Sequence, residues 1–142
     1  MRGVKFTIPL APISKKNSQR ILQNRSTGRP FIAPSAQYKQ YEREAARFIP
    51  RGVTIRWPVN VKTVFYMPTR RRVDLVNLEE AAHDVMVTCG LLADDNRDII
   101  AGTDGSRVYY DKDNPRTEVE IAPVIGFETW KDVEEWQYEN TL

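Results

Sequence analysis

The sequence predicts a single domain that contains both β-strands and α-helices. Three observations support this fold class. The chain has 142 residues, a usual length for one domain with a core of its own. Residues 57–67 (WPVNVKTVFYM) are β-branched and aromatic, as in a strand. Apolar residues recur at helical spacing over residues 78–89.

The N-terminal third predicts a strand, a hairpin or loop, and a helix. Residues 4–10 (VKFTIPL) alternate weakly, as a strand does. Residues 14–35 hold two short runs around a Ser-Thr-Gly turn, which predicts a basic hairpin or loop. A helix is expected from Ser35 onward, and the side chains at helical spacing are Tyr38, Tyr41, Ala45 and Phe48.

The helix near residues 77–89 has the clearest pattern in the chain. Its apolar stripe consists of Leu78, Ala81, Ala82, Val85, Met86 and Cys89. Asn77, followed by Glu80, resembles an N-terminal cap, and Gly90 suits the left-handed residue after a helix. Cys89 is expected to pack in the core. His83 lies off the stripe and is expected to be exposed, with no functional role.

The last third predicts two or three strands over residues 97–124, joined by turns at Asp-Gly and Asp-Asn-Pro. The segment from Phe127 predicts an acidic helix. The expected organisation is therefore one domain over residues 1–126 and a C-terminal acidic helical extension over residues 127–142.

Charge is distributed unevenly along the chain. Residues 1–73 hold 16 Lys and Arg against 2 Asp and Glu, whereas residues 74–142 hold 5 against 17. This asymmetry favours a polyanionic partner such as nucleic acid, although two interleaved halves that neutralise each other would give the same counts. A single Cys and a single His exclude an internal disulfide and a His-pair metal site. Because no apolar run is long enough for a leader or a membrane span, we expect a soluble cytoplasmic protein without a membrane partner.

Carboxylates gather at both ends of the predicted helix and along it. They are Asp74, Glu79, Glu80, Asp84, Asp94 and Asp95. An all-oxygen ligand set of this kind suits Mg²⁺, which polarises a phosphodiester and activates the attacking water. The arginines 70–72 could hold the flanking phosphates.

Simpler structural roles remain open for each of these groups. Glu79 and Glu80 favour a helix N-terminus through the macrodipole alone. The sequence Asp94-Asp95-Asn96 is a good turn by itself. The three arginines could form an ordinary solvated charge run.

The order of these residues resembles a known family. RRRVDLVNLEEAAHDVMVTCGLLADD is similar to the signature of the RusA family of Holliday junction resolvases. There an Arg-rich stretch leads into Asp-Leu-Asp-Asn-Leu, a Lys one turn later, an Asp-containing helix, Gly and a final Asp-Asp. TIPLAPISKKNSQR, SAQYKQYEREA and VNVKTVFYMPTRRR resemble the family's N-terminal strand and loop, its first helix and its central strand. The resemblance covers about residues 4–122.

The resemblance implies a RusA-like α+β fold, in which a small mixed β-sheet carries helices packed on it within a single domain. It also implies a homodimer that binds four-way DNA junctions and cuts two strands symmetrically, using Mg²⁺ held by aspartates, with Mn²⁺ as an alternative. Asn77 matches the motif Asn. We expect Asp74, Glu80 and Asp95 to be catalytic. The expected metal ligands are Asp74, Glu80, Asp84, Asp94 and Asp95.

Two positions depart from the family pattern. Val76 replaces a motif Asp, and Glu80 replaces the motif Lys. The two positions are one helical turn apart if the helix has begun at residue 76, so Glu80 or Glu79 could supply the missing carboxylate. Lys112 or one of the arginines 70–72 could supply the missing cation.

The leading hypothesis is therefore a Mg²⁺-dependent, structure-selective DNA endonuclease that resolves four-way junctions. One alternative is a dimeric module that binds branched DNA with weakened catalysis. Another is a related nuclease that acts on flaps or forks. The residues expected to contact DNA are Lys15, Lys16, Arg20, Arg25, Arg29, Arg70, Arg71 and Arg72.

Overall fold

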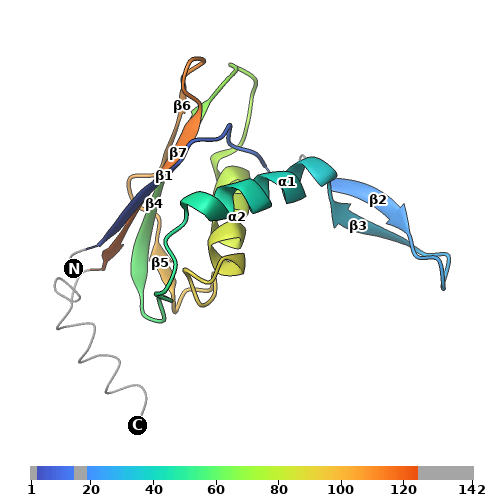
Figure 1. Cartoon of the computed structure of the whole chain (residues 1–142), viewed down its shortest axis with the longest axis horizontal. Helices are drawn as coiled ribbons and strands as arrows, with labels where there is room; N and C mark the ends of the chain where they lie inside the picture. The colour runs from blue at the N-terminus through green and yellow to red at the C-terminus, as the bar shows by residue number, and fades with distance from the viewer. Residues whose placement is uncertain (1–2, 15–18, 125–142) are drawn as a thin grey trace, which may run out of the picture.

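The computed structural model describes residues 3–14 and 19–124 (Figure 1). In chain order the elements are β1 (Val4–Ile8), β2 (Gln19–Gln23), β3 (Pro30–Pro34), α1 (Ala36–Ala45), the short 3₁₀ helix η2 (Ala46–Phe48), β4 (Val59–Met67), α2 (Leu75–Thr88), β5 (Ile100–Gly102), β6 (Arg107–Tyr110) and β7 (Arg116–Pro123). The expected strands and the first two expected helices are all present. The acidic helix expected over residues 127–142 lies outside the described residues and stays a prediction.

The main sheet has five strands and is organised around β4. Its order is β1-β7-β4-β5, and β6 also pairs with β4, farther along that strand than β5. The β1–β7 and β7–β4 pairs are antiparallel, whereas β5 and β6 run parallel to β4. The predicted α+β class with a small mixed sheet is therefore confirmed.

One face of this sheet is buried and carries both helices (Figure 1). Buried and partly exposed residues alternate along β4, because successive side chains of a strand point to opposite faces. Val59, Val61, Thr63 and Phe65 point to the helices, and Val61 and Phe65 belong to the hydrophobic core. The other face holds side chains such as Lys62 and Tyr66.

Helix α1 begins where the sequence predicts. Ser35 is its N-cap, and the Ser35 Oγ accepts a hydrogen bond from the backbone N–H of Tyr38 at 3.1 Å. Tyr38, Tyr41 and Ala45 are buried, so the helical spacing of these residues marks the face that packs on the core.

Helix α2 begins three residues earlier than the predicted cap at Asn77 implies. Asp74 occupies the N-cap position with extended backbone, and its carbonyl accepts from the N–H of Leu78 at 3.2 Å. The expectation that Asn77 caps the helix is wrong, because Asn77 lies within the first turn. The apolar stripe is confirmed: Leu78, Ala81, Ala82, Val85 and Met86 are buried, and Cys89 is partly buried against the core.

The C-terminal end of α2 is closed by a Schellman motif. Gly90 has a φ of +83°, its N–H bonds to the carbonyl of Val87 at 3.0 Å, and the N–H of Leu91 bonds to the carbonyl of Met86 at 3.0 Å. Leu91 and Met86 are both buried, as this motif favours. Ile55 then accepts from the N–H of Ala93 at 2.9 Å and donates to the carbonyl of Leu91 at 2.7 Å, so the chain leaving α2 is held in place.

Strands β2 and β3 form a separate hairpin that projects away from the sheet beyond α1 (Figure 1). The side chain of Asn24 accepts backbone N–H bonds from Ser26 and Thr27, and Gly28 has a φ of +72°. Both features stabilise the turn. Ile21 is 76% exposed on this hairpin.

No helix among the described residues is both long and apolar enough to cross a membrane.

The cap of α2 generates a stability prediction. Replacing Gly90 with Ala is expected to lower the free energy of unfolding by about 1 kcal/mol, because Ala is strained at positive φ. A Cβ at this position would meet nothing within 4 Å, so the cost is one of backbone conformation alone. Urea denaturation measures the change.

Gly90→Asn is the matched control, since Asn tolerates the left-handed region better than Ala. It should destabilise the protein less than Gly90→Ala. An unfolding free energy for Gly90→Ala equal to that of the unaltered protein would contradict the role given to this cap.

Candidate metal and DNA-binding site

Asp74 presents its carboxylate at the start of α2. The side chain is exposed and caps no backbone N–H of the helix. Its Oδ2 accepts a hydrogen bond from the Asn77 side-chain amide at 3.3 Å. Asn77 therefore orients Asp74 instead of capping the helix, and the carboxylate of Asp74 keeps lone pairs for a further ligand.

Val76, Glu80 and Asp84 form one row along α2. Because the helix begins at Leu75, each of these residues lies one turn from the next. Val76 is 64% exposed, Glu80 is exposed and Asp84 is half-buried. The motif that the sequence resembles has a carboxylate at the position of Val76. The Glu80 carboxylate of this chain lies one helical turn farther along the same row.

Glu79 lies on a different side of the helix. Successive residues are rotated by about 100° around a helix axis, so Glu79 points about 100° away from Glu80 and farther still from Asp84, although it is also an i+3 neighbour of Val76. Glu79 is half-buried, and burial raises the pKa of its carboxyl group. Between the two glutamates, helix geometry favours Glu80 as the residue that replaces the missing carboxylate.

His83 is closer to the acids than the sequence suggested. The expectation of an exposed side chain is wrong: His83 is half-buried, and its Nε2 has no hydrogen-bond partner among the described residues. Burial lowers the pKa of the imidazole, and the charges of Asp95, Asp84 and Glu80 oppose that shift. Acids from α2 and from the loop after it therefore act on one side chain. In the sequence, the position of His83 directly before Asp84 is the signal that points to this acidic surrounding.

Asp84 also acts on the first helix. Burial raises the pKa of the Tyr38 hydroxyl, and the negative charge of Asp84 raises it further. Tyr38 lies on the buried face of α1, so the charge of Asp84 on α2 acts on the face of α1 that packs on the core.

Asp94 and Asp95 are exposed in the loop that follows the cap of α2. The Asp94 Oδ1 accepts the backbone N–H of Asp95 at 2.7 Å, so Asp94 has a structural role in the turn. The negative charge of Asp95 raises the pKa of His83, as do the charges of Asp84 and Glu80. The loop and α2 thus contribute acids that act on the same imidazole.

The five predicted metal ligands do not form one preassembled cluster. Within residues 3–14 and 19–124, no three His, Cys, Asp or Glu side chains are close enough together to enclose a metal ion. Carboxylates that converge without a cation repel one another. The metal site therefore stays a prediction.

The arginines before α2 lie beside the turn that connects β6 and β7. Arg70, Arg71 and Arg72 are exposed. The guanidinium of Arg70 lies 4.2 Å from the centre of the Tyr110 ring. The next residue, Asp111, donates its N–H to the carbonyl of Met67 at 2.9 Å, which fixes the turn beside the end of β4.

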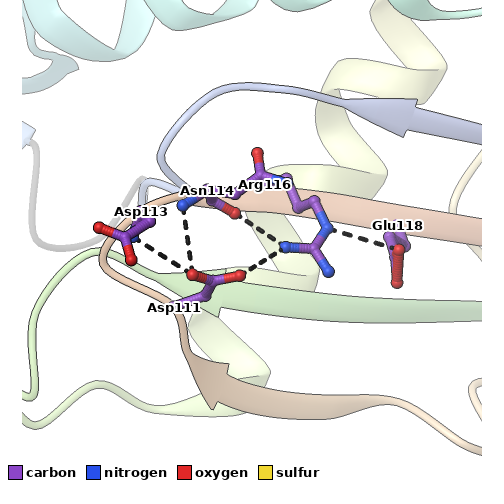
Figure 2. A network of polar contacts seen from close by, with 5 residues as sticks. All are labelled: Asp111, Asp113, Asn114, Arg116 and Glu118. Atoms are coloured by element: carbon purple, nitrogen blue, oxygen red, sulfur yellow. Dashed lines mark hydrogen bonds and ion pairs between the residues drawn. The ribbon is translucent and has the colours of Figure 1, made fainter.

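Figure 2 shows the polar network that holds this turn. The Arg116 guanidinium donates to the Asp111 carboxylate at 2.9 Å and to the Asn114 carbonyl at 2.9 Å, and it reaches Glu118 at 3.5 Å. The hydrogen bond from Arg116 lowers the pKa of Asp111. Lys112, which the sequence offers as a replacement cation, is exposed within the turn.

The remaining basic candidates lie elsewhere. Arg25 and Arg29 are exposed on the β2–β3 hairpin, a separate projection from the arginines before α2 (Figure 1). Lys15 and Lys16 lie outside the described residues, as does the side chain of Arg20.

Comparison of the sequence with known proteins assigns the chain to a family. Residues 9–122 match the family described as endodeoxyribonuclease RusA. The crossover junction endodeoxyribonuclease RusA of Escherichia coli strain K12 is 33% identical over 98 residues, which is 67% of this chain and 76% of that protein. The crossover junction endodeoxyribonuclease of Enterobacteria phage 82 shows the same identity and coverage. The chain therefore belongs to the RusA family of endodeoxyribonucleases.

Proposed function

We propose that this protein resolves four-way DNA junctions by paired symmetric incisions and that it needs a divalent metal ion. The observation that carries the proposal is the set of acids on α2 and its flanking loops, beside exposed arginines, in a RusA-family chain. The relatives that the chain matches are named crossover junction endodeoxyribonucleases.

The donor set fits Mg²⁺, with Mn²⁺ as the alternative, because its ligands are carboxylate oxygens. Mg²⁺ is usually bound by one or two carboxylates, with waters and phosphate oxygens completing the shell. A site that offers fewer than three protein ligands is therefore sufficient to bind the ion before DNA supplies phosphate oxygens. When bound, the ion would polarise the phosphodiester and lower the pKa of the attacking water. The residues that would hold it are Asp74, Glu80, Asp84, Asp94 and Asp95.

The chain's own residues have separate tasks in this proposal. Asn77 orients the Asp74 carboxylate through their hydrogen bond. Arg71 and Arg72 hold the phosphates that flank the scissile bond, as guanidinium groups do with two parallel hydrogen bonds. Arg25 and Arg29 contact the DNA backbone farther away, on the projecting hairpin.

A homodimer follows from the proposed reaction. Two symmetric cuts require two active sites related by a two-fold axis, which a dimer of identical chains supplies. The strongly basic N-terminal half of each chain would provide affinity for the junction arms that depends on salt and little on sequence.

One observation favours a second candidate function. Val76 places an exposed apolar side chain where the family motif has a carboxylate. If no other acid replaces that ligand, the protein is a module that binds branched DNA without cutting it. A labelled four-way junction incubated with the protein, with and without Mg²⁺, separates these functions: cleavage supports the enzyme, and binding without cleavage supports the module.

Replacing Asp95 with Asn is expected to lower the rate of Mg²⁺-dependent junction cleavage by about 100-fold or more, in the range typical of lost catalytic groups. Junction affinity measured without metal should stay within about twofold, because Asn is isosteric and the basic residues supply most of the binding.

Asp98→Asn is the matched control, since Asp98 is an exposed acid in the same loop with no proposed role. It should cleave as the unaltered protein does. Equal losses in the two variants would show that the Asp95 effect is not specific to the site.

Glu80→Gln should slow cleavage by about 10-fold or more and raise the Mg²⁺ concentration needed for half-maximal rate. The reason is that the substitution replaces a negatively charged carboxylate ligand with a neutral amide. Glu79→Gln should change neither quantity by more than about twofold, since Glu79 lies on another side of α2.

Adding Val76→Asp to Glu80→Gln tests whether the carboxylate has moved by one turn. The double variant should recover cleavage if positions 76 and 80 serve the same ion. Undiminished cleavage by Glu80→Gln alone would rule out Glu80 as a ligand.

A further inference from the structure

We infer that Tyr110 and Arg70 form a stacking platform for the face of an unpaired nucleobase at the branch point of the DNA. The inference rests on the proposed function and deepens it, because it names groups by which this site would distinguish a junction from a duplex.

Strand pairing decides where Tyr110 points. β6 runs parallel to β4, with Val108 beside Phe65 and Tyr110 beside Met67. Phe65 is buried, and Val108 packs against the core. Because side chains alternate along a strand, Tyr110 lies on the same face of the sheet as the helices, whereas Tyr109 lies on the opposite face with Tyr66. The Tyr109 and Tyr66 ring centres are 5.6 Å apart.

Tyr110 is an accessible aromatic ring with a planar cation stacked on it. Its side chain is 41% exposed, and the Arg70 guanidinium lies 4.2 Å from the ring centre. Arg70 restrains the orientation of the ring through a cation–π interaction. Aromatic rings and guanidinium planes are the groups on which proteins stack unpaired bases.

The platform lies close to the proposed cutting site. Arg70 and Asp74 are four positions apart in the sequence, so their two Cα atoms are at most about 14 Å apart. Adjacent bases of one strand are about 3.4 Å apart along a helix axis, so this distance corresponds to about four base steps. The backbone that carries Arg70 is therefore within about four base steps of Asp74, and the Arg70 side chain reaches from there to the Tyr110 ring.

Charge around the platform favours DNA. Arg71 and Arg72 are exposed on one side, and Lys112 is exposed two residues beyond Tyr110. The acid next to the ring, Asp111, forms an ion pair with Arg116 at 2.9 Å (Figure 2), which reduces its repulsion of an approaching phosphate.

The platform should act at branch points and not along a duplex. Bases in a continuous duplex are already stacked and paired, so they offer no free face. Pairing is interrupted where strands exchange, and the cost of unstacking a base is smallest there. Stacking on Tyr110 would therefore add affinity for a junction while leaving duplex affinity unchanged.

The test uses the full-length protein without metal, so that binding is measured without cleavage. The DNA is a four-way junction with 2-aminopurine beside the crossover, and a duplex of the same length and charge serves as the reference. We expect Tyr110→Ala to weaken junction binding by about 10-fold while duplex binding changes by less than about twofold. Binding of the unaltered protein should quench the 2-aminopurine, and Tyr110→Ala should abolish that quenching.

Three variants separate stacking from other causes. Tyr110→Phe should retain junction affinity and quenching, because the ring remains. Tyr109→Ala is the matched control, since Tyr109 is 52% exposed on the opposite face, and it should change neither quantity. Arg70→Lys keeps the charge but removes the planar group, so it should lose part of the junction preference.

Failures of the inference and of the proposed function are distinguishable. Junction preference and quenching that persist in Tyr110→Ala would overturn the platform alone, as would an equal loss in Tyr109→Ala or an equal loss on the duplex. If the unaltered protein binds the junction no better than the duplex, the proposed function fails, and the platform fails with it.

Discussion

The packing of α2 against β4 is the constraint on which the rest of the structure depends. Leu78 and Val85 of the helix share one buried core with Val61 and Phe65 of the strand. Burial of this kind fixes which side of a helix faces inward, so the row of Val76, Glu80 and Asp84 must lie toward the outside. The cap at Gly90 and the backbone bonds to Ile55 then fix the loop that carries Asp95. A hydrophobic interface thus determines the placement of the charged residues.

The parallel pairing of β6 with β4 is the second constraint, because it determines which exposed side chains are neighbours at one edge of the sheet. Carboxyl ends of parallel strands meet at the same edge of a sheet. Here the loop after β4 carries the three arginines, Tyr110 is the last residue of β6, and Lys112 lies in the turn that follows. Segments about 40 positions apart in sequence are therefore neighbours. The Arg116 network stabilises the turn, which gives these exposed side chains a defined position.

The departures from the family motif have different structural consequences. A carboxylate lost at Val76 can be replaced by Glu80 without a change of backbone, because one turn of helix separates them on the same row. A lost lysine has no such neighbour on α2. In the proposed function its positive charge would come from another element: the arginines before the helix and Lys112 in the β6–β7 turn are on segments that the sheet brings together.

The sequence alone determined the elements whose patterns are local: β4, the stripe of α2, the start of α1 at Ser35 and the glycine that ends α2. It also identified the family, because the acids and arginines of this chain follow the order and spacing of the family motif. It misplaced Asn77 and His83, because spacing along a helix does not reveal which neighbours surround each side chain. Only the tertiary structure decided that β6 pairs with β4, that Arg70 stacks on Tyr110, and that the charge of Asp95 acts on His83 of α2. These contacts join segments that are far apart in the sequence. Strand order and burial determine the contacts, and no local sequence pattern encodes strand order or burial.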